Sequence, residues 1–478
     1  MTAKSEKLAV FRCSASAVIG FGHLRRCKAL AERLSRVGWV CEFATEGGSA
    51  VDLSQRWPDG VTLLVTDGYD IDATFESACR PWAETIVVID DLADRPHDAD
   101  ILIDHNVGRR AEDYAALVPS GCRIFAGPGF AVLATDFPER RQSLVPRPAR
   151  ASSEPTIIVS LGGGDTALQR QLLDTVLEGL ALIGDPVEVV AIVPTEQQAA
   201  DVVARGFRAR TVIDAAEMTD LIANADVAVG AGGVSLLERS VLGLPSLVTT
   251  VADNQRPGTE AAAATNACQD LGPAASVTPR AVADAAGTLL SDRAAWMQAS
   301  GAAARVTDGF GTARIVAALT AGSTDRDGAP VALRRAGIED TELLRSWQCH
   351  PDTRAFSRNT NVPNSREHIA WMDRQLACGT SIFNVVIRDD EPVGVMRLDK
   401  LSGDRTGYEV SILTDPGLYG RGLAAAALEQ APYLADGQPI WAWVAGENTA
   451  SHALFRRAGY KPAEGGWYVA VEESVAEC

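Results

Sequence analysis

The chain lacks a regular cysteine framework and a long apolar run. It has no Cys-x-x-Cys pair, and no apolar run approaches the roughly 20 residues that span a bilayer. Its nine cysteines are scattered, so we predict neither a disulfide framework nor a metal site. Met1 to Val10 show no cleavable signal pattern. We therefore expect a soluble cytoplasmic protein that works without a metal.

Basic residues are also scarce, with 44 Lys and Arg against 62 Asp and Glu and a net charge of −18. Such a surface repels a phosphate backbone, which argues against nucleic acid as a partner. Small anions stay possible, because backbone N–H groups at a helix N-terminus bind phosphate whatever the net charge. The 478 residues, of which 46% are hydrophobic, are enough for about three globular domains.

What the chain does contain is an alternation of short β-branched runs with alanine- and leucine-rich stretches, which is typical of parallel α/β units. The clearest runs are 61–65, 86–90, 156–160, 188–194 and 226–230. We predict domains at 1–148, 149–322 and 330–478. The first boundary lies in the proline- and arginine-rich stretch 143–155, and 322–330 is expected to be a flexible linker. In the third domain antiparallel strands are expected.

The first strand-to-helix loop points to an anion and to a base. Its glycines, Gly20 and Gly22, allow a ligand close to the backbone, and the helix that follows runs from His23 to Arg36. His23 is a candidate general base because the unperturbed pKa of histidine lies near neutrality. The alternative is a helix-start histidine bonded to solvent or backbone. Polar side chains at later strand ends could orient a sugar or this histidine, or could simply cap loops: Asp67, Tyr69, Asp90, Asp91 and Asn106.

The second half repeats the strand–glycine loop–helix unit twice, at SLGGGD (160–165) and GAGGVSLLER (230–239). Backbone amides at Gly232 and Gly233 could meet a pyrophosphate, and Glu238 could accept hydrogen bonds from ribose hydroxyls. DNQ (253–255) follows the next strand and is expected to face the same site. A purely structural helix start is the alternative, but several such loops at strand ends favour a nucleotide site.

These stretches, with IGFGHLRRCKALA (19–31), DGY (67–69), IDDLADRPHDADILIDHN (89–106) and LGLPSLVTTVADNQRP (242–257), resemble one family over residues 8 to about 320. It is the UDP-2,4-diacetamido-2,4,6-trideoxy-β-L-altropyranose hydrolase family of pseudaminic acid biosynthesis, which has two Rossmann-like domains of glycosyltransferase-B type. The resemblance implies that His23 activates water and that Tyr69 and Asn254 contact the sugar or its leaving phosphate. The implied UDP-sugar-binding residues are Arg12, Gly20, Gly22, Gly163, Asp165, Gly232, Gly233, Ser235, Glu238 and Gln255. The chain departs from the family at Ser14, where an acid usually stands.

The last third contains PGLYGRGLAAAAL (416–428) and WAWVAGENTASHALFRRAGY (441–460), which resemble the GNAT acetyltransferases over residues 331–470. NSREHIAWM (364–372) further resembles the subgroup that acetylates the 4-amino group of UDP-sugars. The resemblance implies an acetyl-CoA cosubstrate. Its expected contacts are Leu418, Gly420, Arg421, Gly422, Leu423, Ala424 and Asn448.

Acetyl transfer to an amine needs a base and a group that protonates the leaving thiolate. Glu409 is the candidate base, and its alternative is a solvent-facing strand residue. The tyrosine acid usual in the family falls at Phe455, so either Tyr460 or water replaces it or the thiolate leaves unassisted. His368 and Trp371 either line the sugar pocket or belong to the core.

We therefore predict an α/β chain with two Rossmann-like domains followed by a GNAT domain. The expected function is bifunctional: acetylation of the 4-amino group of a UDP-sugar and release of UDP from the 2,4-diacetamido product, with no membrane partner and the oligomeric state left open. The alternatives are a UDP-sugar glycosyltransferase with an acetyltransferase module, and a degenerate UDP-sugar-binding protein.

Overall fold

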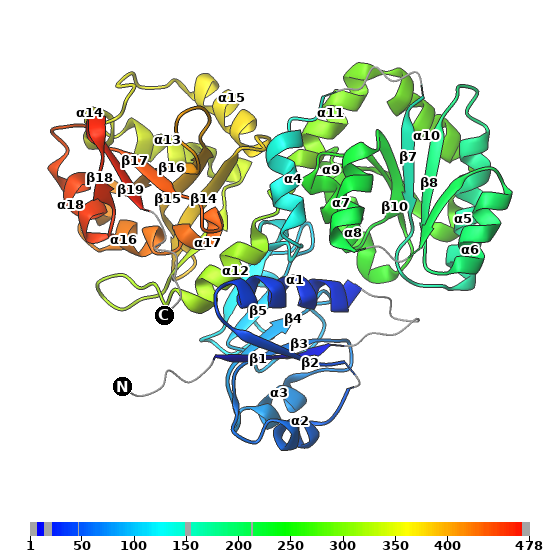
Figure 1. The fold of residues 1–478 in the computed structure, drawn as a ribbon, viewed down its shortest axis with the longest axis horizontal. Helices are drawn as coiled ribbons and strands as arrows, with labels where there is room; N and C mark the ends of the chain where they lie inside the picture. Colours follow the sequence, from blue (N-terminus) through cyan, green and yellow to red (C-terminus); the bar gives the residue numbers. More distant parts are fainter. Residues whose placement is uncertain (1–6, 14–21, 46, 149–153, 212–213, 471–478) are drawn as a thin grey trace. The chain divides into compact units, whose positions relative to one another are not determined.

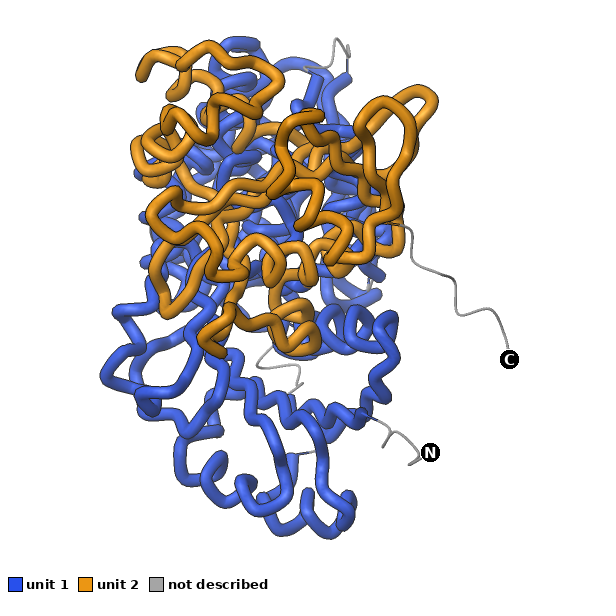
Figure 2. Tube along the Cα trace, turned by 90° about the vertical axis from the view of Figure 1, so that its left-hand side faces the viewer, with its two compact units in different colours: residues 1–312 blue, residues 313–478 orange. Residues whose placement is uncertain are grey.

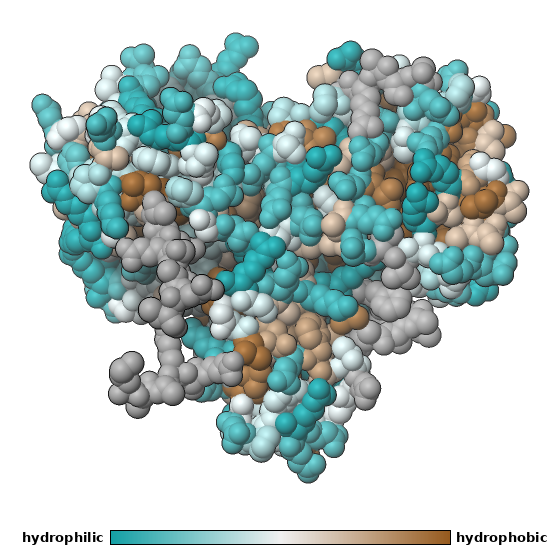
Figure 3. Space-filling model, viewed as in Figure 1, coloured by the Kyte–Doolittle hydropathy of each residue, from teal (hydrophilic) through white to brown (hydrophobic). Residues whose placement is uncertain are grey.

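A computed structural model describes residues 7–13, 22–45, 47–148, 154–211 and 214–470. Two compact units make up the chain, residues 1–312 and 313–478, shown in blue and orange in Figure 2. Hydrophilic side chains cover most of the face drawn in Figure 3, as the charge composition implies. Among the described residues no helix is long and apolar enough to cross a membrane.

The first half of unit 1 is a six-stranded parallel sheet in the order β2-β1-β3-β4-β5-β6 (Figure 1). Its strands are β1 Leu8–Cys13, β2 Val40–Ala44, β3 Val61–Asp67, β4 Ala83–Ile89, β5 Ile101–Asp104 and β6 Arg123–Ala126, and its helices are α1 Gly22–Arg36, α2 Ala50–Arg56, α3 Ala73–Cys79 and α4 Asp136–Leu144. The strand order reverses between β1 and β3. Ligands of open α/β sheets bind beyond the strand ends at such a point, which here means beside Cys13 and Asp67.

The second half of unit 1 is another six-stranded parallel sheet, ordered β12-β11-β10-β7-β8-β9. Its strands are β7 Thr156–Ser160, β8 Glu188–Val193, β9 Arg208–Thr211, β10 Val227–Ala231, β11 Ser246–Thr250 and β12 Gln269–Pro273. Its helices are α5 Ala167–Ala181, α6 Glu196–Ala204, α7 Ala215–Asn224, α8 Val234–Val241, α9 Arg256–Ala264, α10 Pro279–Ser291 and α11 Arg293–Ala304, and α12 Gly311–Thr320 crosses the boundary between the units. The order reverses between β7 and β10, so the glycine loops that follow these strands lie together at the switch point.

The connection between the two halves is held by buried arginines. Arg141, on α4, donates to the carbonyls of Val241 (2.6 Å) and Ala304 (3.0 Å). Arg147, three residues beyond α4, donates to the carbonyls of residues 222, 223 and 225 at the end of α7. These contacts explain why the proline-rich stretch separates two sheets but leaves one compact unit.

Unit 2 is built on a seven-stranded mixed sheet ordered β13-β14-β15-β16-β17-β19-β18. The strands are β13 Val331–Arg335, β14 Ser381–Arg388, β15 Glu391–Lys400, β16 Tyr408–Thr414, β17 Ile440–Trp443, β18 Lys461–Pro462 and β19 Trp467–Ala470. The helices are α13 Thr341–Cys349, α14 Pro351–Ala355, α15 Ser365–Leu376, α16 Leu423–Leu428, α17 Ala431–Ala435 and α18 Thr449–Arg457. The antiparallel pairing of β14, β15 and β16 confirms the change of pattern predicted for this region. The fold is therefore the predicted one, two Rossmann-like sheets followed by a separate mixed α/β domain.

The expectation of a flexible linker at 322–330 is wrong. Asp325 is buried, and its Oδ1 accepts hydrogen bonds from the backbone N–H groups of Asp327 and Ala329, both at 2.9 Å. Its Oδ2 lies 2.5 Å from Arg388 Nε on β14. The segment is therefore a tight turn held against β14 of unit 2. The buried Asp325 carboxylate binds the backbone N–H groups of the turn, whereas the side chains of a flexible spacer would be exposed to solvent.

Candidate functional site

The candidate base, His23, lies in the first turn of α1 and is buried. Its Nδ1 lies 2.5 Å from Asp67 Oδ1, at the end of β3. Arg26 Nη2 also lies 3.1 Å from this Nδ1 but donates to Asp67 Oδ1 at 2.6 Å. Since an ionised carboxylate only accepts hydrogen bonds, the shorter Asp67 contact assigns the ring proton to Nδ1. Among the described residues no group contacts Nε2, so that nitrogen is left to take a proton from water or substrate. The structure thus places a carboxylate beside the histidine. This carboxylate is Asp67, at the end of β3.

Asp67 is itself fixed by Arg26, one turn along α1. Arg26 Nε donates to Oδ2 and Nη2 to Oδ1, each at 2.6 Å, in a fully buried bidentate pair. Burial alone would raise the pKa of Asp67, but Arg26 and His23 hold that pKa well below its usual range. Asp67 therefore stays ionised and can stabilise a protonated His23.

Tyr69 and Asn254 come from different halves of unit 1 and meet. Asn254 Nδ2 donates to the Tyr69 hydroxyl at 3.0 Å, and that hydroxyl donates to Asp91 Oδ2 at 3.4 Å. The Tyr69 ring packs edge-on against His23, with ring centroids 4.8 Å apart. These contacts place three of the four predicted catalytic residues in one cluster, although Asn254 lies 185 residues beyond Tyr69.

Other sequence-predicted residues of the first half have different surroundings. Arg12, at the end of β1, pairs with Asp70 (2.6 Å). Gly22 opens α1. Gly20 and Ser14 lie outside the described residues. Of the other strand-end residues, Asp90 accepts a hydrogen bond from the buried Tyr114 hydroxyl (2.8 Å) and ion-pairs with Arg95. Asp90 therefore has the structural role in the loops that was the alternative to orienting a sugar.

His105 was not singled out from the sequence, yet it belongs to the same cluster. It is buried, directly after β5, and desolvation lowers its pKa to about 3, with Arg26 adding to the effect. Its Nδ1 faces the backbone N–H of Val132 at 3.4 Å, and its Nε2 has no partner among the described residues. The sequence signal that could have identified His105 is its position within DHN (104–106), directly after a strand.

The nucleotide candidates of the second half surround the β7/β10 switch point. Glu238, on α8, is buried, its Oε2 has no partner among the described residues, and desolvation raises its pKa while Arg25 and Arg239 oppose the shift. A buried, unpaired carboxylate oxygen is costly unless a ligand supplies a donor. A ribose hydroxyl is such a donor, so this residue fits the predicted role.

The two glycines of the β10–α8 loop, Gly232 and Gly233, differ in how much space surrounds them for a side chain. A Cβ at Gly232 would collide with Thr259 Oγ1 on α9, whereas a Cβ at Gly233 would meet only Gln255 Nε2, at 3.5 Å. Gln255 Oε1 accepts from the Val251 backbone N–H (3.2 Å), and Ser235 Oγ lies 3.5 Å from the Ala231 carbonyl.

If the loop holds UDP as the sequence predicts, Gly232→Ala should weaken that binding about 10-fold to 100-fold, since overpacking costs on the order of 1–3 kcal/mol. Gly233→Ala is the matched control and should change the affinity much less. Titration calorimetry of both variants with UDP measures the effect. Equal losses in the two variants would contradict this account of the loop.

The β7–α5 loop is less tied to a ligand. Gly163 is exposed there, and the Asp165 carboxylate is already bound by Arg170 Nε (2.7 Å) and Gln198 Nε2 (2.8 Å). Among the described residues no cluster of three or more His, Cys, Asp or Glu side chains could hold a metal ion.

In unit 2 the glycine loop follows β16. Gly420 and Gly422 have φ of +83° and +86°, and a Cβ at Gly422 would press on Arg326 at 3.2 Å. The Arg326 backbone N–H donates to the Arg421 carbonyl (2.9 Å), so the anchored turn at 325–327 supports the loop. Leu418 ends the preceding turn, Leu423 is buried, Ala424 follows it on α16, and Asn448 caps α18 through Ser451 N.

Strands β16 and β17 pair only at Tyr408–Ile440 and Glu409–Trp441, although β16 continues to Thr414. Beyond Glu409 the two parallel strands therefore diverge, and the backbone of β16 is not paired with β17. This opening and the glycine loop after β16 are an arrangement into which the extended, amide-containing arm of acetyl-CoA fits.

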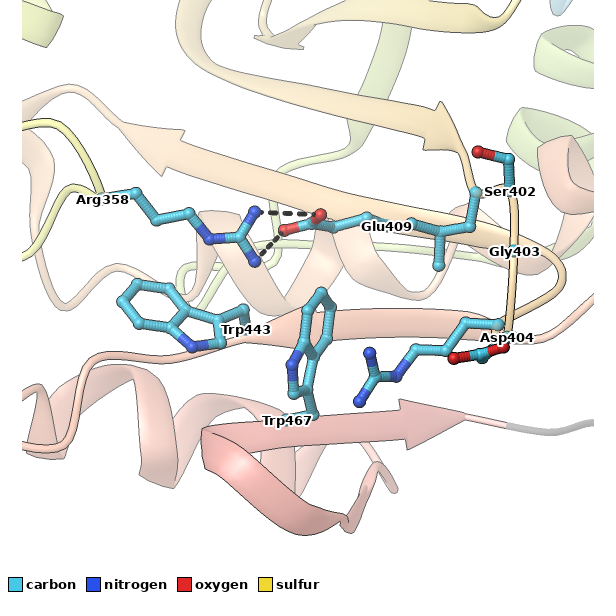
Figure 4. Close-up of a pocket in the computed structure, with 9 residues that line it drawn as sticks. Arg358, Ser402, Gly403, Asp404, Glu409, Trp443 and Trp467 are labelled. Carbon is cyan, nitrogen blue, oxygen red and sulfur yellow. Dashed lines mark hydrogen bonds and ion pairs between the residues drawn. The ribbon is translucent and has the colours of Figure 1, made fainter.

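Glu409 lies at the start of this divergence and lines a cavity of about 790 Å³. Its carboxylate is paired with Arg358, Oε1 with Nη2 at 2.7 Å and Oε2 with Nη1 at 3.1 Å (Figure 4). The sequence did not indicate Arg358, because it stands 51 residues away in an irregular segment. Glu409 is thus neither a simple solvent-facing residue nor a free base.

The remaining open alternatives concern aromatic residues. His368 is buried and stacks on Trp371, which packs against Phe383 and the core of unit 2, so the core alternative is the one observed. Phe455 contacts Tyr460, whose buried hydroxyl has no partner among the described residues and whose pKa burial raises. A second tyrosine was missed: Tyr468 lies 2.8 Å from His452 Nδ1 through its hydroxyl.

The first comparison with known proteins concerns unit 2. Residues 331–461 match the family model described as Acetyltransferase (GNAT) domain. In the N-terminal part the chain is similar to a UDP-2,4-diacetamido-2,4,6-trideoxy-beta-L-altropyranose hydrolase of Campylobacter jejuni, 28% identical over 145 residues. That match covers 27% of this chain and 52% of the relative, so the chain spans about half the length of the curated protein. Both findings confirm the predicted fusion of a hydrolase-like region with a GNAT domain.

Solved structures are similar to the two parts at low scores. MurG of Acinetobacter baumannii aligns with a TM-score of 0.46 and 12% identity over 65% of this chain and 98% of its own. RimJ of Mycobacterium smegmatis, solved in complex with CoA-disulfide, aligns with a TM-score of 0.27 and 17% identity over 31% of this chain and 85% of its own. The strand orders given above, and not these scores, define the fold.

Proposed function

We propose that the chain is a bifunctional nucleotide-sugar enzyme. Unit 2 transfers an acetyl group to the 4-amino group of a UDP-linked sugar, and unit 1 then hydrolyses the bond between UDP and the 2,4-diacetamido-2,4,6-trideoxy-β-L-altrose product. The observation that carries the hydrolase is the buried Asp67–His23 pair, whose Nε2 has no hydrogen-bond partner among the described residues. The reaction belongs to pseudaminic acid biosynthesis and takes place in the cytoplasm, a setting consistent with the eight described cysteines, all free.

For hydrolysis, His23 Nε2 takes a proton from water while Asp67 stabilises the resulting imidazolium. The water oxygen forms a bond to the anomeric carbon as the bond to the UDP oxygen breaks. Tyr69 and Asn254, joined by their hydrogen bond, would hold the sugar or the leaving phosphate. Glu238 would accept from the ribose, and the amides at Gly232 and Gly233 would bind the diphosphate, so no metal is needed.

For acetyl transfer, acetyl-CoA supplies the acetyl thioester. The amides around Gly420 and Gly422 would hold its pyrophosphate, and Glu409 would take the proton of the substrate ammonium. Linking the two units keeps the acetylated intermediate at a raised local concentration near the second site.

The test is a mass-spectrometric assay of the full chain with UDP-4-amino-4,6-dideoxy-N-acetyl-β-L-altrosamine, with and without acetyl-CoA, beside His23→Ala. We expect free diacetamido sugar and UDP only when acetyl-CoA is present. The variant should stop at the acetylated UDP-sugar. If both proteins bind the sugar and leave it unchanged, the hydrolase and acetyltransferase assignments fail for this compound.

The glycosyltransferase alternative predicts sugar transfer to an acceptor and no free sugar in this assay. The degenerate-binder alternative predicts UDP binding without turnover. The His23, Tyr69 and Asn254 cluster favours catalysis over the degenerate binder, because a pure binder has no need of an oriented histidine.

A further inference from the structure

The cavity beside Glu409 is lined by two arginines, two carboxylates and two tryptophans. It is lined by the loop 401–405, by Glu409 on β16, by Trp443 on β17, by Trp467 on β19 and by Arg358 (Figure 4). Its volume of about 790 Å³ is in the range of small-molecule sites. None of these residues belongs to the acetyl-CoA loop, and of them only Trp443 lies within a quoted sequence motif, 441–460.

Arg405 has no carboxylate partner among the described residues. Its guanidinium lies over the Trp467 ring at 4.5 Å and over the Trp441 ring at 5.3 Å, and in the described part of the chain it has no hydrogen bond or ion pair. Asp404 also lines the cavity but pairs with neither arginine. A guanidinium stacked on rings keeps its in-plane N–H donors free, which suits a phosphate. In a chain of net charge −18, this unpaired cation points to an anionic ligand.

Arg358 is a second cation beside the same ring. It lies 5.1 Å from the Trp467 centroid and 4.9 Å from the Trp443 centroid, and its side chain is 50% exposed. Both arginines therefore contact the same Trp467 ring. At the same time Arg358 occupies both carboxylate oxygens of Glu409, so Glu409 can take up a proton only at the expense of this ion pair.

We infer that the cavity is a phosphate-gated acceptor site, in which the phosphate of the amine substrate binds Arg405 and draws Arg358 away from Glu409. This inference rests on the proposed acetyltransferase function. The freed carboxylate takes one proton from the substrate ammonium. The neutral nitrogen then forms its bond to the acetyl carbon, the carbon–sulfur bond breaks with its electrons on sulfur, and one of the two hydrogens left on nitrogen passes as a proton to the thiolate or solvent while the other stays in the amide. An amine without phosphate leaves Arg358 on Glu409 and is a poor substrate.

The test compares two acceptors that differ only in the anion: the UDP-linked 4-amino sugar and its methyl glycoside. We expect the wild-type chain to prefer the UDP-linked acceptor by about 100-fold or more in kcat/KM, the range of two charge-assisted hydrogen bonds. Arg405→Gln should raise the KM of that acceptor about 10-fold with little change in kcat, and should leave the glycoside unaffected. Arg358→Gln should speed the glycoside several-fold and slow the UDP-linked acceptor, so the preference collapses.

Arg345→Gln, which removes a half-buried arginine that pairs with Glu342 on α13, controls for the loss of one charge. A second readout needs no turnover: pyrophosphate should change the tryptophan emission of the wild-type chain, because Arg358 covers Trp443 and Trp467, and Arg405→Gln should abolish that change. If Arg358→Gln lowers both acceptors equally, or if pyrophosphate affects both proteins alike, the gate is overturned while the acetyltransferase stands. If wild-type protein acetylates neither acceptor, the proposed function fails and the gate with it.

Discussion

Replacing His23 by glutamine is expected to lower the rate of UDP release about a thousandfold, within the 10²–10⁴ range of general base catalysis. Glutamine can keep a hydrogen bond to Asp67 and fill a similar volume, but it cannot take a proton from water. Affinity for UDP should persist, because the candidate nucleotide residues lie on the β10–α8 loop. Acetylation by unit 2 should also persist. A coupled assay of UDP release and calorimetry with UDP measure both quantities.

Asp67→Asn separates chemistry from architecture. The change removes the carboxylate charge that Arg26 binds through Nε and Nη2 and leaves only the longer pair with Asp91 (3.5 Å), and breaking such a buried pair costs about 3–5 kcal/mol. We expect this variant to lose both hydrolysis and thermal stability, whereas His23→Gln loses hydrolysis alone. Wild-type turnover by His23→Gln would remove this residue from the reaction.

The parts of the site that could be predicted from the sequence are those that local chain geometry dictates. A strand, a glycine loop and a helix are consecutive in sequence, so Gly232, Gly233 and Glu238 could be assigned to one switch point from the order of elements. The family resemblance added Tyr69 and Asn254, whose contact spans the two halves.

The parts that could not be predicted depend on tertiary contacts between polar side chains in irregular or distant segments. Asp67 was one of several strand-end carboxylates, and only the reversal of strand order between β1 and β3 brings it to His23. Arg358 and Arg405 carry no periodic pattern, and arginine in a loop is ordinarily solvated. Their stacking depends on three tryptophans brought together by the pairing of β17 with β19. The turn at Asp325 was missed because glycine and aspartate are as typical of mobile linkers as of tight turns.

Replacing Glu409 by glutamine is expected to lower acetylation of the UDP-linked amine at least about a hundredfold at neutral pH, since an amide cannot accept the ammonium proton. Arg358 then loses the carboxylate to which it is paired. The loss should appear in kcat/KM for every amine acceptor, with or without phosphate, which distinguishes the base from the arginines around it. Hydrolysis of a UDP-sugar that is already acetylated should be unchanged, because unit 1 carries its own histidine.

Glu391→Gln is a suitable control, as Glu391 is an exposed residue at the start of β15. Mass spectrometry of the products then distinguishes three outcomes. Accumulated amino sugar with intact hydrolysis of the acetylated compound supports Glu409 as the base. Undiminished acetylation would mean that water or another group takes the ammonium proton. Arg358 could then not act as a gate, because the carboxylate that it covers would not be the base. Loss of both activities would mean that the variant disturbs the whole chain, and a thermal melt that matches the control would contradict that explanation.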